Sequence, residues 1–294
     1  MKQQQMANNL QILILAAGKG TRMNSDLPKV LHKVIGVPMI DHVIGKASLL
    51  RPKSITIMVN KNLIFLKKKF LKLKFLIQEP QLGTAHAVQI FQKQNKDKNS
   101  KLLVLYADNP LVNINDLKKI KKELNKNDVV ILGFEEMNNS SYGIIVEKKG
   151  SVDEIVEFKD ATKEQRKEQT CNSGIVALSS RSLNLVSKIK NNNIKKEYYL
   201  TDIVKLSKKY NYKIKLVTAA DSKTALGIND MCELGTAEQI MQNQLRKKAL
   251  KQGVRMIDPD TVYLSKDTTF GKNITIEPFV VIGPKVKIGT GSIV

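Results

Sequence analysis

A short aliphatic run that ends in a turn of glycines and cations constrains this chain most, within residues 10–38 (LQILILAAGKGTRMNSDLPKVLHKVIGVP). Residues 12–17 are apolar and too few for a free-standing helix, so they predict a buried strand of a parallel sheet. The run stops at residues 18–22 (GKGTR), where two glycines let the backbone turn tightly and approach a ligand. Lysine and arginine in that turn add positive charge, as does Lys29, which follows a proline that fixes φ. Because open α/β sheets bind ligands at the carboxyl ends of their strands, this stretch predicts a site for a nucleotide phosphate.

Two better-known phosphate-binding patterns do not fit this turn. A P-loop has the pattern G-x-x-x-x-G-K-[ST], whereas Lys19 lies between the two glycines. A dinucleotide loop has the pattern G-x-G-x-x-G, and Met23 stands where the third glycine is required. An ordinary glycine turn explains a lone G-x-G, but the whole string L-A-A-G-K-G-T-R-M-x-S-x-L-P-K-V-L closely resembles the signature of sugar-nucleotide pyrophosphorylases. With residues 31–39 included, it is most similar to the bacterial N-acetylglucosamine-1-phosphate uridyltransferases.

The composition argues against membrane and nucleic-acid partners. No apolar stretch in the 294 residues approaches the roughly 20 residues that a membrane span needs. Residues 1–9 also lack the apolar core of a signal peptide, so a cytoplasmic location is expected. The net charge of +22 invites a nucleic-acid partner, but only six of the 49 basic residues are arginines and few aromatic side chains lie among the lysines. We therefore expect neither a nucleic-acid partner nor a membrane partner.

The thiols and imidazoles show no metal-binding spacing. Cys171 and Cys232 lie far apart, and we expect both to be buried free thiols. His32, His42 and His86 are scattered as well, so each is interpreted as a packing or surface residue.

Strands alternate with helices in the first part of the chain. Apolar spacing predicts helices over residues 39–50, 63–71 and 83–92, and strands over residues 54–59, 75–78 and 102–106. This alternation predicts right-handed crossovers and a mostly parallel sheet. Strands joined by turns then follow over residues 129–134, 142–146, 152–158 and 173–178, which predicts an antiparallel extension. An amphipathic helix opening at residues 197–203 and a strand over residues 214–217 come next.

Residues 78–85 (QEPQLGTA) form a polar loop that enters a helix. Amide and hydroxyl groups can read a base edge both as donors and as acceptors, and Gly83 permits close approach. A plain helix entry with Thr84 in the first turn explains the same residues. The order of residues resembles the uridine-binding loop of the uridyltransferases, which implies that Gln78, Gln81, Gly83 and Thr84 bind the nucleotide.

Two oxygen-bearing side chains are candidate metal ligands. Asp108 follows an apolar strand, where a carboxylate facing phosphates suits Mg²⁺, although an aspartate in a turn is also common. Its stretch resembles the Y-G-D-x-P-L of the family, with Ala107 in place of the usual glycine and Asn109 in place of a usually apolar residue. Asn229 by itself fits a helix N-cap, while its similarity to the family's G-[VI]-N implies a second magnesium ligand.

The later strands carry candidate contacts to a sugar phosphate. A hexose with an N-acetyl group needs hydroxyl acceptors, an amide partner and a close backbone, which Glu157, Asn172 and Gly143 supply respectively. Taken singly, each is an ordinary surface or turn residue. Their order resembles the sugar-phosphate contacts of the family, and the same resemblance adds Tyr106 and Thr201.

Apolar residues recur every six positions near the C-terminus. One series is Leu264, Phe270, Ile276, Ile282, Ile288 and Val294, and a second is Ile274, Val280 and Val286. A sustained period of six predicts a parallel β-helix, of which fewer than two coils are present. In the family, a longer left-handed β-helix trimerises and carries an acetyl-CoA-dependent acetyltransferase. We therefore expect no acetyltransferase activity from these residues, and a homotrimer through the β-helix remains an open alternative.

Together these features predict an α/β protein in three parts. A Rossmann-like (GT-A-like) nucleotidyltransferase sheet, mostly parallel with an antiparallel extension, is expected over residues 1–229, a linker helix over 230–253, and a short left-handed parallel β-helix over 254–294. The resemblance implies transfer of uridylyl from UTP to N-acetyl-α-D-glucosamine 1-phosphate, with Mg²⁺ as cofactor, Arg22 and Lys29 as catalytic residues, and Asp108 and Asn229 as metal ligands. The implied substrate-binding residues are Leu15, Ala16, Ala17, Gly18, Lys19, Gly20, Gln78, Gln81, Gly83, Thr84, Tyr106, Gly143, Glu157, Asn172, Thr201 and Asn229. A related enzyme with another sugar or nucleotide, and a catalytically silent UDP-sugar-binding protein, are the alternatives.

Overall fold

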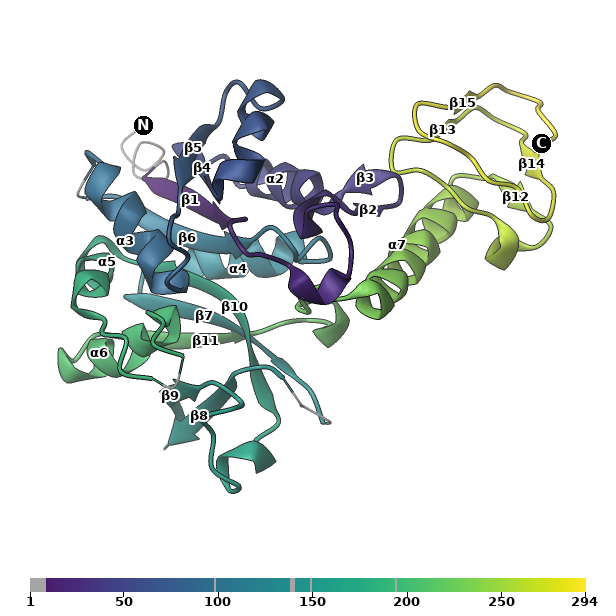
Figure 1. The fold of residues 1–294 in the computed structure, drawn as a ribbon. Coiled ribbons are helices and arrows are strands. Elements are labelled where there is room, and N and C mark those ends of the chain that lie inside the picture. The colour runs from purple at the N-terminus through teal and green to yellow at the C-terminus, as the bar shows by residue number, and fades with distance from the viewer. Residues whose placement is uncertain (1–8, 98, 138–140, 149, 194) are drawn as a thin grey trace, which may run out of the picture. The chain divides into compact units, whose positions relative to one another are not determined.

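The computed structural model describes residues 9–97, 99–137, 141–148, 150–193 and 195–294 (Figure 1). Contacts along the chain divide it into two compact units. The sheet unit comprises the chain up to Lys19 and from Val43 to Gly227, and the coil unit comprises Gly20–His42 and Ile228–Val294.

The sheet unit is built on a nine-stranded sheet whose main path has the order β11-β7-β10-β6-β1-β4-β5. Its strands are β1 (Leu10–Leu15), β4 (Ser54–Val59), β5 (Lys74–Ile77), β6 (Lys101–Tyr106), β7 (Val129–Glu135), β8 (Ile144–Lys148), β9 (Ser151–Val156), β10 (Thr170–Leu178) and β11 (Ile214–Thr218). Strand β1 pairs in parallel with β4 and β6, β4 with β5, and β7 with β11. The mainly parallel central sheet expected from the sequence is thus confirmed.

The four later strands pair antiparallel with one another, in the order β7-β10-β8-β9. The sequence predicts them as an extension beside the sheet, whereas β7 and β10 lie inside its main path. The reason is that β10 also pairs with β6 and that β11 returns in parallel beside β7. Only β8 and β9 extend off the main path.

Five α-helices belong wholly or partly to the sheet unit: α2 (Met39–Leu49), α3 (Thr84–Gln94), α4 (Ile114–Glu123), α5 (Ser180–Leu185) and α6 (Ile203–Lys209). The amphipathic helix expected over residues 63–71 is a 3-10 helix, Lys61–Lys68, with Leu63 and Leu66 on its buried side, and it ends three residues before the expected boundary. The Asn60 side chain caps its start by accepting a hydrogen bond from the Leu63 amide at 3.2 Å.

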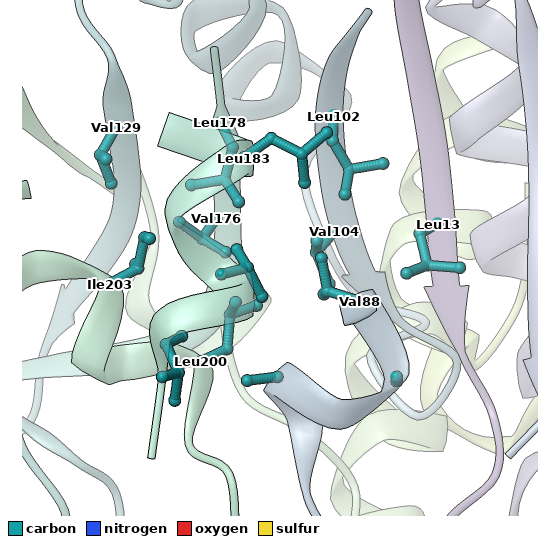
Figure 2. Close-up of a cluster of buried hydrophobic side chains, with 14 of the residues drawn as sticks. Leu13, Val88, Leu102, Val104, Val129, Val176, Leu178, Leu183, Leu200 and Ile203 are labelled. Atoms are coloured by element: carbon teal, nitrogen blue, oxygen red, sulfur yellow. The ribbon is translucent and has the colours of Figure 1, made fainter. Parts of the chain in front are cut away.

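The core of the sheet unit lies between the sheet and helices α3, α5 and α6 (Figure 2). Leu13 of β1, Val104 of β6 and Val176 of β10 meet Val88 of α3 and Ile203 of α6 there. Their neighbours along the strands, which point to the other face, are buried as well: Ile12, Ile14, Leu103, Leu105, Val130 and Ala177 are at most 1% exposed. Burial on both faces explains why these strands are continuous apolar runs in the sequence.

One buried carboxylate joins three elements at an end of this core. Asp128, just before β7, accepts two hydrogen bonds from the Arg181 guanidinium, one from Ser179 Oγ at 3.0 Å and one from the Lys213 amide at 2.9 Å. Burial alone would raise the pKa of the Asp128 carboxyl, but these hydrogen bonds and the charge of Arg181 outweigh it and hold the pKa below its ordinary value.

We expect Asp128→Asn to lower the free energy of unfolding near neutral pH by about 1–3 kcal/mol, because hydrogen bonds to a charged acceptor are lost. A folded-state pKa below the unfolded one gives stability that is full above the unfolded value near 3.9 and lost as pH falls through the folded value. Urea unfolding at several pH values should show the difference between native protein and variant closing in acid. A difference in the free energy of unfolding that stays constant as the pH falls would contradict this role. Asp97→Asn, at an exposed pair with Lys53, is the matched control and should change stability less.

The coil unit contains one long helix followed by short strands. Its elements are β2 (Lys33–Val34), β3 (Val37–Pro38), α7 (Met231–Lys251), β12 (Arg255–Met256), β13 (Thr269–Phe270), β14 (Thr275–Ile276) and β15 (Lys287–Ile288). Strand β12 pairs in parallel with β14, and β13 with β15. The partner of Thr269 is Lys287 and that of Tyr263 is Val281, so these pairs lie three six-residue repeats apart. Most of the predicted period-six residues gather in one apolar cluster with Val262 and Met256.

The two cysteines differ in environment. Cys171 is a buried free thiol, and burial raises its pKa to about 11, with the nearby charge of Glu136 adding to the shift. Cys232 is exposed, so the expectation of a second buried thiol is wrong. It lies in the first turn of α7, which begins at Met231. Among all the residues that the structure describes, no helix is long and apolar enough to cross a bilayer.

Candidate active site

The carboxyl ends of β1 and β6 lie side by side in the sheet unit. The Ala107 amide donates to Leu15 O at 2.9 Å, which extends the pairing one residue past the end of β6. Ala107 is fully buried and is not among the residues with positive φ, so alanine meets no backbone strain at the position where the family usually has glycine. The predicted residues Leu15, Ala16 and Ala17 thus end at the edge that also carries Tyr106 and Asp108. Gly18 and Lys19 continue from this edge and are exposed.

The side chain of Gln78 makes a hydrogen bond inside the predicted nucleotide-binding loop, residues 78–85. This side chain is only 6% exposed and donates from Nε2 to Gly83 O at 2.8 Å. The Tyr198 amide donates to Leu82 O at 2.8 Å, and the Leu200 amide donates to Thr84 Oγ1 at 3.0 Å. Gln78, Gly83 and Thr84 are therefore brought together, whereas no contact places the half-buried Gln81.

Gly83 is the residue of this loop that tolerates a side chain least. Its φ is +105°, and an added Cβ would lie 2.6 Å from Tyr198 O. We expect Gly83→Ala to destabilise the protein by about 1–3 kcal/mol, through backbone strain and the clash. Gly45→Ala in α2 is the matched control, because an added Cβ there meets nothing within 4 Å. In a helix this substitution should stabilise by about 0.5–1 kcal/mol. Thermal unfolding of both variants checks the prediction, and equal melting temperatures would contradict it.

A second cluster surrounds the Tyr106 ring. The register of β10 shifts between Asn172 and Val176, and Gly174 in this bulge has a φ of +84°. Asn172 Oδ1 accepts from the Gly174 amide at 3.0 Å, and an added Cβ at Gly174 would lie 2.7 Å from the Tyr106 ring. Tyr106, Asn172 and Thr201 line a cavity of about 20 Å³. Burial raises the pKa of the Tyr106 phenol, and the nearby charges of Glu157 and Asp108 raise it further. The phenol is thus a neutral hydrogen-bonding group at physiological pH.

A larger pocket of about 580 Å³ opens beside this cluster. Glu157, Asp160, Tyr199, Thr201, Asp202 and Lys190 are among the residues that line it. An added Cβ at Gly143 would lie 3.7 Å from Glu157 Oε1, so this glycine leaves room beside the carboxylate. Burial raises the pKa of the Glu157 carboxyl, while Lys195 opposes the shift and Asp160 and Asp202 add to it. The pocket has the size and the hydrogen-bonding groups that a polar small molecule needs.

Asp108 is half-buried and lies beside Gly227, the last residue of the sheet unit. An added Cβ at Gly227 would lie 3.8 Å from Asp108 Oδ1, so this glycine lies directly beside the carboxylate. Asn109 is 1% exposed and donates from Nδ2 to Ala225 O at 3.1 Å. This hydrogen bond ties the Asp108 turn to the Ala225–Gly227 segment, and sequence reasoning did not find it.

The described residues contain no group of three or more His, Cys, Asp or Glu side chains that could hold a metal ion. A cation at Asp108 would therefore take at most two such side chains from the described residues, and its other ligands from neutral oxygens, water or substrate. That donor set fits Mg²⁺, which usually takes one or two carboxylates plus phosphate and water oxygens.

In the coil unit, the two predicted catalytic cations meet at Asn229. Arg22 Nη2 donates to Asn229 Oδ1 at 2.8 Å, and Lys29 Nζ donates to the same oxygen at 3.0 Å. Gly20 has a φ of +65°, and an added Cβ would lie 2.5 Å from Lys29 Cβ, so the glycine lets the turn pack onto the lysine stem. Three side chains expected from two separate motifs thus form one cluster.

The start of α7 fixes the position of Asn229. Asp230, not Asn229, is the N-cap, because its side chain accepts from the Glu233 amide at 2.9 Å. Glu233 reaches back and accepts a hydrogen bond from the Asn229 amide. This reciprocal pair resembles a capping box shifted by one residue. The D-x-x-E spacing of residues 230–233 was the signal in the sequence that could have predicted it.

A mainly parallel sheet with a glycine-rich turn and Asp108 at the carboxyl ends of its strands is the arrangement of an α/β nucleotide-binding protein. The family model of the MobA-like NTP transferase domain matches residues 12–168, and the chain belongs to this family. The chain is also similar to the bifunctional protein GlmU of Paramagnetospirillum magneticum, at 38% identity over 287 residues that cover 96% of this chain and 64% of that protein. Its identity to the bifunctional protein GlmU of Bartonella quintana is 36% over 288 residues, with coverages of 96% and 64%. The chain therefore spans about 64% of the length of these two relatives.

A solved structure supports the fold. A Bacillus anthracis protein, assigned as a glucose-1-phosphate thymidylyltransferase and crystallised with sucrose, superposes with a TM-score of 0.63 at 19% identity. The match covers 79% of this chain and 94% of that one. It shows a shared α/β nucleotidyltransferase fold.

Proposed function

We propose that this protein transfers uridylyl from UTP to N-acetyl-α-D-glucosamine 1-phosphate, releasing pyrophosphate and forming UDP-N-acetylglucosamine. The observation that carries the proposal is the similarity to GlmU proteins over 96% of the chain, together with the signature of residues 15–31. Convergence of Arg22, Lys29 and Asn229 in the coil unit supports it, since these residues come from two of the recognised motifs.

The reaction requires little covalent chemistry from the protein's side chains. The phosphate of the sugar substrate already carries an ionised oxygen near neutral pH, so no general base is needed. Catalysis then rests on in-line positioning and on neutralising charge. The backbone of residues 15–20 would hold the triphosphate, Arg22 would stabilise charge on the α-phosphate and the leaving pyrophosphate, and Lys29 would orient phosphate oxygens at the reacting centre.

Asp108 and Asn229 would hold Mg²⁺. The support is the resemblance of the stretches around Asp108 and Asn229 to two motifs of the uridyltransferase family. A bound Mg²⁺ would neutralise phosphate charge of both substrates. Because Arg22 and Lys29 both donate to Asn229 Oδ1, these cations would leave that oxygen and turn to the phosphates when substrate binds.

The two substrates would occupy different parts of the sheet unit. Gln78, Gln81, Gly83 and Thr84 would contact the uracil. Glu157, Asn172, Gly143 and Thr201, with Tyr106 behind them, would contact the N-acetyl sugar phosphate. The support is that Glu157 and Thr201 line the larger cavity and that Tyr106, Asn172 and Thr201 line the smaller one, where their carboxylate, amide and hydroxyl groups match contacts that this sugar requires.

We also propose that residues 1–229, 230–253 and 254–294 correspond to a catalytic domain, a linker helix and the first coils of a left-handed parallel β-helix. Parallel pairing of residues three hexads apart and the shared apolar cluster support the β-helix. Through it the chain could assemble as a homotrimer, which light scattering would detect.

A panel of substrate pairs tests the proposed function. Pyrophosphate release is measured with UTP or dTTP, each with N-acetylglucosamine 1-phosphate or glucose 1-phosphate. We expect the UTP and N-acetyl sugar pair to react fastest and only with Mg²⁺. Preference for another pair would identify a related nucleotidyltransferase instead. Binding of UDP-N-acetylglucosamine by calorimetry without turnover of any pair would identify a UDP-sugar-binding protein.

A further inference from the structure

The segment from Lys61 to Gln78 is strongly basic and contains no carboxylate. Its lysines are Lys61, Lys67, Lys68, Lys69, Lys72 and Lys74, and all six are exposed. Lys61 pairs with Glu79 at 2.6 Å, whereas Lys67, Lys68, Lys72 and Lys74 take part in no ion pair within the described ranges. This surface, the 61–77 patch, therefore carries concentrated positive charge.

The same patch exposes large apolar side chains between the lysines. Leu71 is 83% exposed, Phe65 51%, Ile77 41% and Ile64 38%. Leu63 and Leu66 are the buried side of the 3-10 helix and already fill the core beneath it. The outward apolar residues are therefore not needed for packing within the sheet unit.

Protection of the sheet edge explains only part of this pattern. Strand β5 is the last strand of the sheet and pairs with β4 alone, and lysines on an edge strand discourage pairing with another chain. Only Lys74 lies in β5, however, while Lys67 and Lys68 lie on the preceding helix. Edge protection also gives no reason to expose Phe65 and Leu71.

We propose that the 61–77 patch binds the surface of an anionic phospholipid bilayer. Clustered lysines are attracted to acidic headgroups, and interleaved Leu, Ile and Phe side chains insert at the boundary between headgroups and acyl chains. Such binding needs no membrane-spanning helix and adds a membrane partner that the sequence analysis did not expect. A nucleic acid fits the patch less well, because it has no arginine and Phe65 is its only exposed aromatic ring.

Sedimentation of the full chain with vesicles tests this proposal. Vesicles of phosphatidylcholine alone are compared with vesicles of phosphatidylcholine and phosphatidylglycerol in equal parts. We expect binding only to the anionic vesicles, with release as salt screens the charges. The variant Lys67→Gln/Lys68→Gln/Lys69→Gln should bind on the order of a hundredfold more weakly, from the loss of three surface charges. Phe65→Ser/Leu71→Ser should also weaken binding because it removes insertion, but its binding should depend on salt as steeply as that of the native protein because it keeps the charge.

The matched control is Lys247→Gln/Lys248→Gln/Lys251→Gln on α7, which removes the same charge from exposed lysines outside the patch. Its binding should stay close to that of the native protein. Equal losses in both triple variants would show that net charge alone drives binding, and would overturn the proposal. Retention of RNA oligonucleotides but not of anionic vesicles would overturn it too. Pyrophosphate release by the same variants reports separately on the proposed function, since none of these residues belongs to the candidate active site.

Discussion

Asp108→Ala should lower Mg²⁺-dependent pyrophosphate release from UTP and N-acetylglucosamine 1-phosphate by about 10²-fold to 10³-fold. This is the loss usually seen when a group that stabilises transition-state charge is removed. The effect should be large because the described residues offer no cluster of carboxylates that could replace Asp108 at this edge of the sheet. Asp108→Asn keeps an oxygen and removes the charge, so its rate should lie between those of Asp108→Ala and the native protein, with a higher requirement for Mg²⁺.

Asp97→Ala is the control for this experiment. Asp97 precedes β6 (Lys101–Tyr106), whereas Asp108 follows it, so the two carboxylates lie toward opposite ends of the same strand. Asp97 pairs with Lys53 on the surface. We expect this variant to keep nearly native activity. Full activity of Asp108→Ala would remove Asp108 from the mechanism, and equal losses in both variants would point to a general loss of folded protein.

Lys29→Met should cost a similar factor of about 10²-fold to 10³-fold, mainly in kcat, because the ammonium is proposed to act on charge that develops in the transition state. Lys29 lies in one cluster with Arg22 and Asn229, so the losses should not be additive. The double variant Arg22→Ala/Lys29→Met should be little slower than the slower single variant. Steady-state kinetics with UTP and the sugar phosphate varied in turn give the separate kcat and KM values.

Lys33→Met is the matched control for the lysine, because Lys33 is an exposed residue of β2 in the same coil unit. It should behave like the native protein. A rise in KM for UTP with unchanged kcat in Lys29→Met would show that Lys29 contributes uniform binding only. Strict additivity of the Arg22 and Lys29 losses would contradict their action as one cluster.

Local sequence patterns predicted the elements whose residues carry a clear signal of burial. The apolar runs of β1, β4 and β6 and the turn after β1 were found because buried parallel strands are apolar on both faces. Helix α4 was not predicted, since its Ile114–Glu123 sequence is lysine-rich and its apolar positions are few. Short helix α5 was missed for lack of length. The place of β7 and β10 inside the sheet depends on pairing with β11 and β6, which no local pattern encodes.

Contacts between residues that are far apart in the sequence could not be predicted from the sequence alone. Arg22 and Asn229 are 207 residues apart, and Asn109 and Ala225 are 116 residues apart. The family resemblance named Arg22, Lys29 and Asn229 separately, but only the structure shows that both cations share one oxygen. Asn109 departs from the family pattern, and its hydrogen bond to Ala225 gives that departure a structural role. The period-six repeat, in contrast, is a local pattern, and parallel pairs near the C-terminus agree with it.

The central claim is that a divalent cation held by Asp108 and Asn229 lets two polyanionic substrates meet at the end of β1. A crystal of the full chain grown with UDP-N-acetylglucosamine, pyrophosphate and Mn²⁺ tests it most directly, since anomalous scattering locates the manganese. We expect the metal to be bound by oxygens of Asp108 and Asn229, with the nucleotide phosphates beside residues 18–22. Nucleotide bound elsewhere, or manganese away from both side chains, would contradict the account.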